Sequence, residues 1–294
     1  MADAQNGLRT CRACGAAALS HRYTVDRFEL FTCRVCSSMS TGYQMTPTAA
    51  GEFYNEDYYR VGDYSDYVGS APFIKRNFRR FARRLAQTHK GARLLEVGCA
   101  YGFFLEIAAS TWQVFGIDVS VAAVASCSPM LAGRVTCGDL LTYQAPSERF
   151  DWVVAWDTIE HLEDPIAYTK RFWELLNPGG HIALTTGDVG SFVARLQGPS
   201  WRLLTPPSHL TFFSRAGMEH LLRGAGFCDV KITTTGYSRS WDFMLYRLLS
   251  PRAYNLFRSC FGRVYDWVAA RGIYLNLHDI MFVTARKPMA PAKR

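Results

Sequence analysis

The chain has 294 residues, of which 49% are hydrophobic and 14% aromatic, and its formal net charge is +8. This length and apolar content exclude a disordered or fibrous protein and leave room for one large domain and a small one. No apolar run reaches the length of a membrane span, and the N-terminus lacks the apolar core of a signal peptide. Five of the nine cysteines stand singly, which argues against a disulfide framework. We therefore expect a cytoplasmic protein.

The first segment, residues 1–46, is predicted to be a zinc ribbon. Two Cys-x-x-Cys pairs stand eighteen residues apart. Four thiolates suit tetrahedral zinc, and so short a segment needs a metal to hold it together. Residues 21–25 and 28–32 alternate like the strands of a hairpin. The predicted ligands are Cys11, Cys14, Cys33 and Cys36. They would form a closed, structural site, and redox-active dithiols are the alternative.

Residues 47–90 are predicted to be a linker followed by a basic helix. The stretch 53–67 is rich in tyrosine, which suits either packing on the outer face of the next domain or a lid over a ligand cleft. Over residues 72–87 a helix would turn Phe73, Phe78, Phe81 and Leu85 toward a core. Its other side carries Lys75, Arg76, Arg79, Arg80, Arg83 and Arg84. This basic side is either a solvated face or a surface for an anionic partner.

A glycine turn opens the domain expected over residues 91–290. An apolar run ends at Val97, with Glu96 just before its end, and Gly98, Ala100 and Gly102 follow at alternate positions. Glycines let the chain bend sharply where a strand gives way to a helix, so a ligand can lie directly on main chain. Asp118 ends the next apolar run, about twenty residues after Gly98, where a carboxylate suits ribose hydroxyls. The spacing predicts a nucleoside site.

Further strands follow in order. Residues 134–140 would form a third strand that ends at Gly138, Asp139 and Leu140, and residues 150–157 a fourth that ends at Asp157. Residues 181–185, 229–235 and 281–287 complete the series, with helices between most of them. A helical insertion is predicted over about residues 237–275.

These motifs resemble those of the class I S-adenosylmethionine-dependent methyltransferases, over roughly residues 91–235 and 281–287. The resemblance implies an α/β fold with a Rossmann-like, doubly wound, seven-stranded and mostly parallel sheet. Ala100 stands where the family pattern has its middle glycine. It also implies that S-adenosylmethionine is bound by Glu96, Gly98, Ala100, Gly102, Asp118, Asp139, Leu140 and Asp157.

Two histidines are candidate catalytic residues. His161 follows the fourth strand, and His209 lies in an aromatic loop after the fifth. Each is either a general base for the acceptor or a structural hydrogen-bonding group. The His209 loop resembles that of bacterial methyltransferases acting on sugars and small metabolites. Pro206 and Ser208 replace the tyrosine and glutamate of the sugar C-methylating enzymes, so we expect O-methylation of a sugar, glycan or lipid-linked metabolite.

Two other partners stay open at this point. The charge of +8 would suit RNA, and a ribosomal-RNA-type methyltransferase using the ribbon and the basic helix is the alternative function. Helices in the insertion, edged by arginines, either cap the substrate cleft or touch the inner face of a membrane. A non-catalytic binding domain is the third reading. The pattern specifies neither the acceptor atom nor the oligomeric state.

Overall fold

The computed structural model describes residues 8–45, 69–85, 91–144, 148–250, 252–254, 256–257, 259 and 271–289. The tyrosine-rich stretch 53–67 lies outside the described residues, as does most of the helix expected after residue 254. In the part that is described, no helix is both long enough and apolar enough to cross a membrane.

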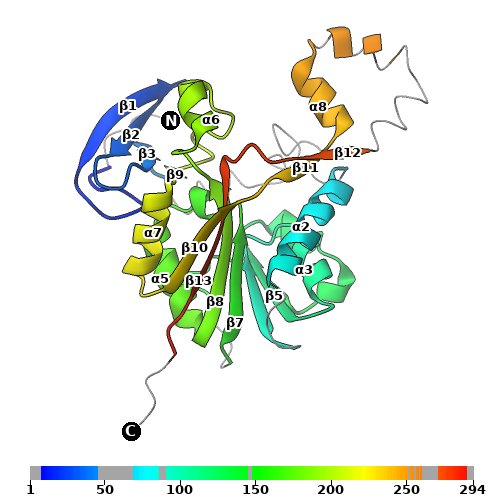
Figure 1. Cartoon of the computed structure of the whole chain (residues 1–294). Helices are drawn as coiled ribbons and strands as arrows, with labels where there is room; N and C mark the ends of the chain where they lie inside the picture. The colour runs from blue at the N-terminus through cyan, green and yellow to red at the C-terminus, as the bar shows by residue number, and fades with distance from the viewer. Residues whose placement is uncertain are drawn as a thin grey trace.

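A seven-stranded sheet forms the centre of the molecule (Figure 1). Its strands in spatial order are β10 (Cys228–Thr234), β13 (Ile280–Arg286), β8 (Leu176–Gly187), β7 (Phe150–Trp156), β4 (Arg93–Val97), β5 (Gln113–Asp118) and β6 (Val135–Cys137). The strands from β8 to β6 run parallel, and β13 runs antiparallel to both of its neighbours. The order reverses beside β4, as in doubly wound sheets that bind ligands at their carboxyl edge. The predicted fold class is confirmed.

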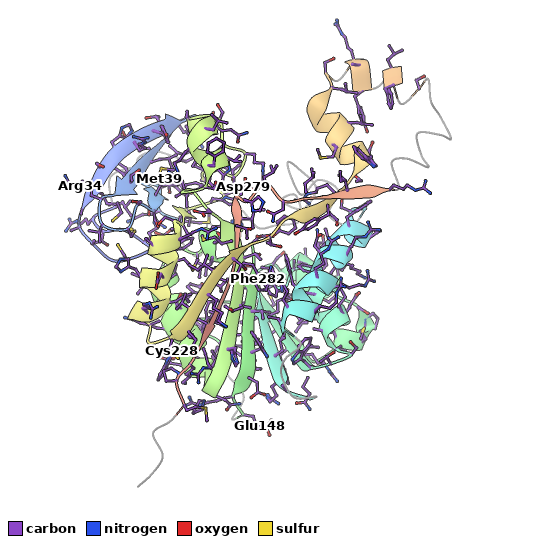
Figure 2. The ribbon with its side chains drawn as sticks, in the orientation of Figure 1. Arg34, Met39, Glu148, Cys228, Asp279 and Phe282 are labelled. Atoms are coloured by element: carbon purple, nitrogen blue, oxygen red, sulfur yellow. The ribbon has the colours of Figure 1, made fainter. Side chains whose placement is uncertain are left out.

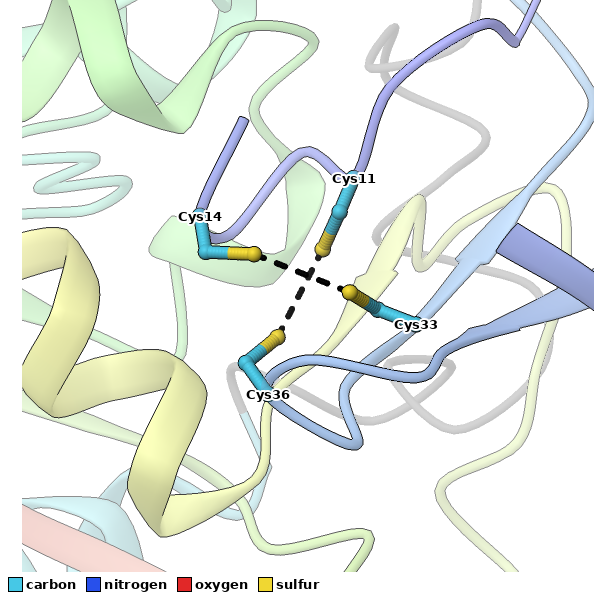
Figure 3. A group of neighbouring side chains, drawn as sticks. All are labelled: Cys11, Cys14, Cys33 and Cys36. Carbon is cyan, nitrogen blue, oxygen red and sulfur yellow. Dashed lines mark hydrogen bonds between the residues drawn. The ribbon is translucent and has the colours of Figure 1, made fainter. Parts of the chain in front are cut away.

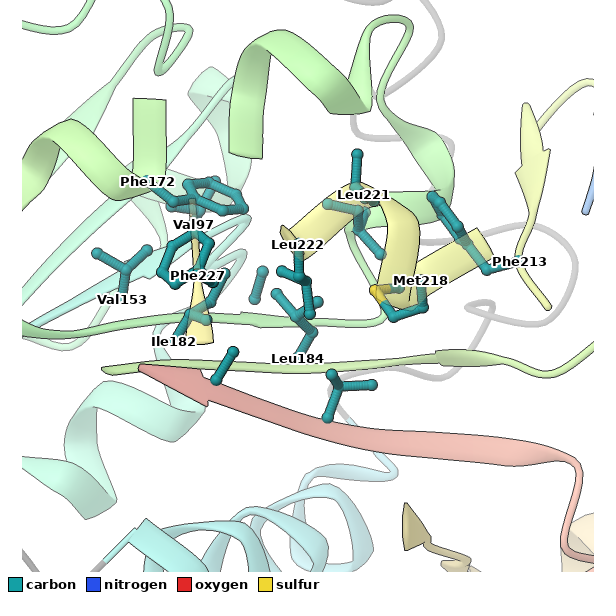
Figure 4. Packing of buried hydrophobic residues seen from close by; sticks show 14 of the residues in the cluster. Val97, Val153, Phe172, Ile182, Leu184, Phe213, Met218, Leu221, Leu222 and Phe227 are labelled. Atoms are coloured by element: carbon teal, nitrogen blue, oxygen red, sulfur yellow. The ribbon is translucent and has the colours of Figure 1, made fainter. Parts of the chain in front are cut away.

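Helices cover both faces of this sheet, because its parallel strands are apolar on both sides. Ile182 and Leu184 of β8 pack on one face with Phe172 of α5 (Pro165–Leu175) and Leu222 of α7 (Arg215–Gly224), as Figure 4 shows. Ala183 turns to the other face, toward α2 (Ala71–Leu85) and α3 (Phe103–Ala108). Short helices α4 (Val121–Ala125) and α6 (Phe192–Gln197) and 3-10 turns at Pro129–Leu131, Ile159–His161 and Gly198–Ser200 complete the domain.

The two ends of the sheet are marked by Glu148, just before β7, and Asp279, just before the antiparallel β13 (Figure 2). Phe282 lies between them on the face covered by α2. The carboxyl ends of the parallel strands lie at the Asp279 end, beside the N-terminal segment. That edge is where the candidate site forms.

Helix α2 matches the helix expected over residues 72–87 almost residue for residue. Phe73, Phe81 and Leu85 are buried as expected, and Phe78 packs at the edge of the same cluster. Asn77 is buried as well: its side chain accepts a 2.7 Å hydrogen bond from the backbone N–H of Ser238 and donates to the Ser238 carbonyl. The helix is therefore joined to a strand that lies 161 residues further along the chain.

The N-terminal segment contains the expected hairpin, formed by β1 (Leu19–Val25) and β2 (Phe28–Cys33). The sheet continues into β3 (Met39–Thr41) and then into β9 (Thr211–Phe212), which belongs to the predicted methyltransferase domain. Cys11, Cys33 and Cys36 share one apolar cluster with Met218 of α7. The N-terminal segment therefore packs directly against the predicted methyltransferase domain, on both sides of the boundary expected after residue 46.

The insertion differs from the helical segment that the sequence predicts. It opens with strand β11 (Tyr237–Ser240) and closes with β12 (Gly272–Leu275), and these pair as an antiparallel ribbon. Helix α8 (Trp241–Leu248) follows β11 and extends away from the central sheet (Figure 1). The sequence between the two strands has helical periodicity, so the short strands at its ends were not predicted.

Candidate active site and metal centre

The turn after β4 has the backbone conformation that its glycines predict. Gly98, Ala100 and Gly102 have φ angles of 73°, 43° and 71°, in the left-handed region. A Cβ atom at Gly98 would lie 2.6 Å from the Thr158 side chain, and one at Gly102 would lie 2.6 Å from that of Leu131. Both positions need glycine for conformation and for space. Alanine at position 100 keeps the turn, since its methyl group is the smallest side chain that can be added.

Two buried carboxylates lie beside this turn. Asp118 accepts hydrogen bonds from the backbone N–H groups of Ala100, at 2.7 Å, and Ser120, at 2.8 Å. Glu96 is 2% exposed, and its Oε2 has no hydrogen-bond partner among the described residues. Burial and the charge of Asp118 together raise the pKa of Glu96 well above its usual value. A cationic ligand at the turn would relieve this excess of negative charge, and S-adenosylmethionine carries both a sulfonium and an ammonium group.

Asp139 and Leu140 lie where the sequence places them, just after β6. Leu140 is buried, and Asp139 accepts a 2.7 Å hydrogen bond from the backbone N–H of Leu141. Burial raises the pKa of the Tyr168 phenol on α5, and the neighbouring Asp139 adds to the rise. The sequence did not indicate Tyr168, because a tyrosine at helical spacing reads as an ordinary core residue.

Asp157 directly follows β7 in a strained conformation, with a φ of 49°. The hydroxyl of Tyr237 donates to its carboxylate at 2.5 Å, and that of Thr185 donates at 2.8 Å. Burial raises the pKa of Asp157, and these two hydrogen bonds oppose the rise. Tyr237 comes from β11 and was not identified from the sequence. Both oxygens of Asp157 thus have protein partners, which leaves less of the carboxylate for a cofactor than the sequence suggests.

The two candidate catalytic histidines lie in direct contact. The rings of His161 and His209 are 4.7 Å apart and almost perpendicular. Nδ1 of His161 lies 2.8 Å from the carbonyl oxygen of Ser208, and Nδ1 of His209 lies 2.8 Å from that of Leu203. Burial lowers the pKa of His161 to about 3, helped by the charge of His209, and that of His209 to about 4. Both imidazoles are neutral near pH 7.

Glu160 joins this pair and was not singled out from the sequence. It is 4% exposed, and one ligand atom from each of Glu160, His161 and His209 lies within 4.8 Å of the others. The backbone N–H of Leu210 donates a 2.8 Å hydrogen bond to the carbonyl of Glu160, which holds the His209 loop against the turn after β7. The Glu-His dipeptide after a strand was the available signal.

The four cysteines of the ribbon converge as the sequence predicts (Figure 3). The Sγ atoms of Cys11 and Cys36 are 3.6 Å apart, and those of Cys14 and Cys33 are 3.7 Å apart. Zinc bound tetrahedrally by thiolates at about 2.3 Å would hold neighbouring sulfur atoms roughly 3.8 Å apart. The separations are much longer than a disulfide bond, so the residues fit a zinc ion.

Much of the basic side of α2 is engaged within the protein. Arg80 donates to the hydroxyl of Ser238 at 2.6 Å and lies over the ring of Tyr274. Arg84 donates to the hydroxyl of Thr233 and lies 3.6 Å from the centre of the Phe282 ring. Lys75 forms an ion pair with Glu106. These contacts fasten the helix to the sheet domain and reduce the charge that it could offer to a nucleic acid.

Two kinds of similarity identify the family. A model described as a methyltransferase domain matches residues 71–232, from α2 to β10. A tRNA U34 carboxymethyltransferase of Methylococcus capsulatus is 28% identical over 180 residues, which cover 54% of this chain and 53% of that protein. A ubiquinone biosynthesis O-methyltransferase of Cereibacter sphaeroides is 33% identical over 155 residues, covering 48% and 62% respectively. The matches thus span only between about half and three fifths of these relatives.

Solved structures share the fold. A SAM dependent methyltransferase from Archaeoglobus fulgidus superposes with a TM-score of 0.51 at 18% identity, over 76% of this chain and all of that one. Phosphoethanolamine N-methyltransferase 2 of Haemonchus contortus, in complex with S-adenosylhomocysteine, gives 0.52 at 19% identity, over 79% and 60%. The sheet order, the glycine turn with its two carboxylates and the matching domain model agree, and the chain belongs to the class I S-adenosylmethionine-dependent methyltransferases.

Proposed function

We propose that the protein transfers the methyl group of S-adenosylmethionine to a hydroxyl group of a sugar, a glycan or a lipid-linked small metabolite. The observation that carries this proposal is the pair of neutral histidines, His161 and His209, which follow strands β7 and β8 at the same sheet edge as the glycine turn. The name of the ubiquinone biosynthesis relative supports oxygen as the acceptor atom. We place this activity in the cytoplasm, with the inner membrane face as the site of a lipid-linked acceptor.

The histidines would act on the acceptor hydroxyl. When bound, S-adenosylmethionine supplies a methyl group activated for in-line displacement, so the protein mainly positions the acceptor and excludes water. The Leu203 carbonyl accepts the Nδ1–H of His209, so Nε2 of that ring is the acceptor nitrogen for a substrate hydroxyl. With a pKa of about 4, this imidazole can accept a hydrogen bond from the hydroxyl at pH 7 without itself becoming protonated.

The four cysteines are proposed to hold one structural zinc ion. Their sulfur separations support tetrahedral binding, and four protein ligands leave no position for water or substrate. The ion would therefore stabilise the ribbon and, through β3 and β9, the loop that carries His209.

An RNA acceptor is the second candidate, because one relative is named for tRNA and the net charge is +8. The contacts that Arg80 and Arg84 make within the protein weigh against α2 as the RNA surface. A small-molecule acceptor fits these contacts better.

Labelled S-adenosylmethionine and a fractionated cell extract would test both candidates. We expect the label to enter a nuclease-resistant fraction of polar metabolites, glycans or lipids. His209→Ala should reduce transfer on the order of a hundredfold with cofactor affinity unchanged, whereas His220→Ala, an exposed residue of α7, should not. Label that enters only nuclease-sensitive material would establish the RNA alternative instead.

A further inference from the structure

We propose that Glu160, His161 and His209 form a binding site for a divalent transition-metal ion, separate from the four-cysteine cluster. The existence of this second metal site does not depend on the methyl acceptor. Its catalytic use does rest on the proposed O-methylation.

The three side chains converge from two segments of the chain. Glu160 and His161 belong to the turn after β7, and His209 comes from the loop before β9. One ligand atom of each lies within 4.8 Å of the others. An ion with bonds of about 2.1 Å keeps adjacent ligands roughly 3 Å apart, so the three ligand atoms would move closer together around a bound ion. The bond from Leu210 N–H to the Glu160 carbonyl holds the two segments in this register.

Glu160 supplies the independent indication that a cation belongs here. The side chain is 4% exposed, and its Oε2 is buried with no hydrogen-bond partner among the described residues. A buried carboxylate is unfavourable when one of its oxygens has no hydrogen-bond partner, unless a proton or a cation compensates the charge. The adjacent imidazoles favour the cation, because they are ligands for it as well.

The histidines are oriented as metal ligands usually are. Each has Nδ1 within 2.8 Å of a backbone carbonyl oxygen, of Ser208 for His161 and of Leu203 for His209. Such bonds fix the ring and its tautomer, and they recur behind metal-bound histidines.

The ligand types select the ion. Two imidazoles and one carboxylate suit Mn²⁺, Fe²⁺, Co²⁺ or Zn²⁺ and leave coordination positions open, whereas the four thiolates of the ribbon select zinc. An acceptor hydroxyl at an open position would have its pKa lowered and lose its proton to water. The resulting oxyanion attacks the methyl carbon, the carbon–sulfur bond breaks, and the products are the methyl ether and S-adenosylhomocysteine. With the ion bound, His209 acts on the hydroxyl through the metal, in place of the direct hydrogen bond from the hydroxyl to its Nε2, and no protein base is needed.

Manganese titration of the full chain tests the binding directly. Mn²⁺ prefers oxygen and nitrogen ligands over thiolates, so zinc can stay in the cysteine cluster. Electron paramagnetic resonance of free Mn²⁺ should show one equivalent bound per chain. We expect the affinity to fall at least tenfold in Glu160→Gln and in His209→Gln, and to stay unchanged in His220→Gln. Circular dichroism checks that each variant is folded. If only one of the two ligand variants folds, its Mn²⁺ affinity alone is sufficient for the test.

The inference is overturned if the wild-type protein binds no Mn²⁺ and no Co²⁺ at millimolar concentration, or if a folded Glu160→Gln or His209→Gln variant binds Mn²⁺ as the wild type does. Because the titration needs neither cofactor nor acceptor, its result is independent of methyl transfer. Bound Mn²⁺ without transfer to any acceptor would leave the metal site standing and count against the proposed function. Methyl transfer by a protein that binds neither Mn²⁺ nor Co²⁺ would support the proposed function and contradict the metal site.

Discussion

The guanidinium of Arg12, between the first two cysteines, forms a 2.9 Å ion pair with Glu163, two residues after His161. Arg12 also donates to the carbonyls of Tyr43 and Glu163, and the backbone N–H of Met45 donates to the Glu163 carboxylate. Ser38 and Ser214 form a second link at the start of α7. The four-cysteine ribbon is thus attached at two places to the segments that carry the candidate catalytic histidines.

We expect Arg12→Ala to lower the free energy of unfolding by about 1–3 kcal/mol, since the carbonyls of Tyr43 and Glu163 and the Glu163 carboxylate lose their charged donor. A double-mutant cycle with Glu163→Ala, followed by urea unfolding, should give a coupling energy of about 1 kcal/mol. The exposed pair of Arg223 and Glu219 is the control and should give less than about 0.5 kcal/mol. Equal coupling in both cycles would mean that Arg12 does not anchor the ribbon.

Cys33→Ser combined with Cys36→Ser should abolish zinc binding, measured by metal analysis of the purified protein. We expect faster hydrogen exchange not only in β2 and β3 but also at residues 210–214, because β9 pairs with β3. The exposed, single Cys137 provides the matched control, Cys137→Ser. If zinc is lost and residues 210–214 keep their protection, the ribbon does not support the His209 loop.

Asp118→Ala should weaken S-adenosylmethionine binding by about 2 kcal/mol or more, measured by calorimetry. The carboxylate would hold the ribose hydroxyls, and it also fixes the turn through the N–H groups of Ala100 and Ser120. Glu174→Ala, on the exposed side of α5, should leave the affinity unchanged. Unchanged affinity in the Asp118 variant would remove this residue from the cofactor site.

Glu96 should make S-adenosylmethionine binding depend on pH. Its pKa is raised in the free protein by burial and by Asp118, so it holds a proton at a pH where an exposed glutamate is ionised. A cationic ligand favours the ionised carboxylate and lowers that pKa. Binding therefore releases a proton, and the affinity rises as the pH increases toward the raised pKa. Calorimetry in buffers of different ionisation enthalpy should detect this proton, which should disappear in Glu96→Gln.

The sequence predicts those parts of the site that depend on local pattern. Spacing within a short stretch of sequence identifies three of these parts. They are the glycine turn, the strand that ends at Asp118 and the two cysteine pairs. The doubly wound, seven-stranded and mostly parallel sheet was predicted from the family resemblance. The helical spacing of its apolar residues predicted which face of α2 is buried.

What the sequence does not predict are pairings between distant segments. Tyr237 reaches Asp157 across 80 residues, and Asn77 meets Ser238 across 161. In each case a polar side chain has a specific partner only because the fold brings two distant segments together. Glu160 was missed for a related reason: a glutamate in a surface-like turn reads as solvated, and only its burial marks it as unusual.

The pairing of β3 with β9 also has a consequence for synthesis. Ser38 and Ser214, which flank this junction, lie 176 residues apart, and a chain grows from its N-terminus. Even if the cysteine segment binds the proposed zinc ion early, the outer edge of β3 stays unpaired until most of the chain has been synthesised. An open strand edge invites association with other chains. Until β9 is synthesised, a nascent chain therefore exposes an open strand edge, and slow elongation between the two segments would lengthen that interval.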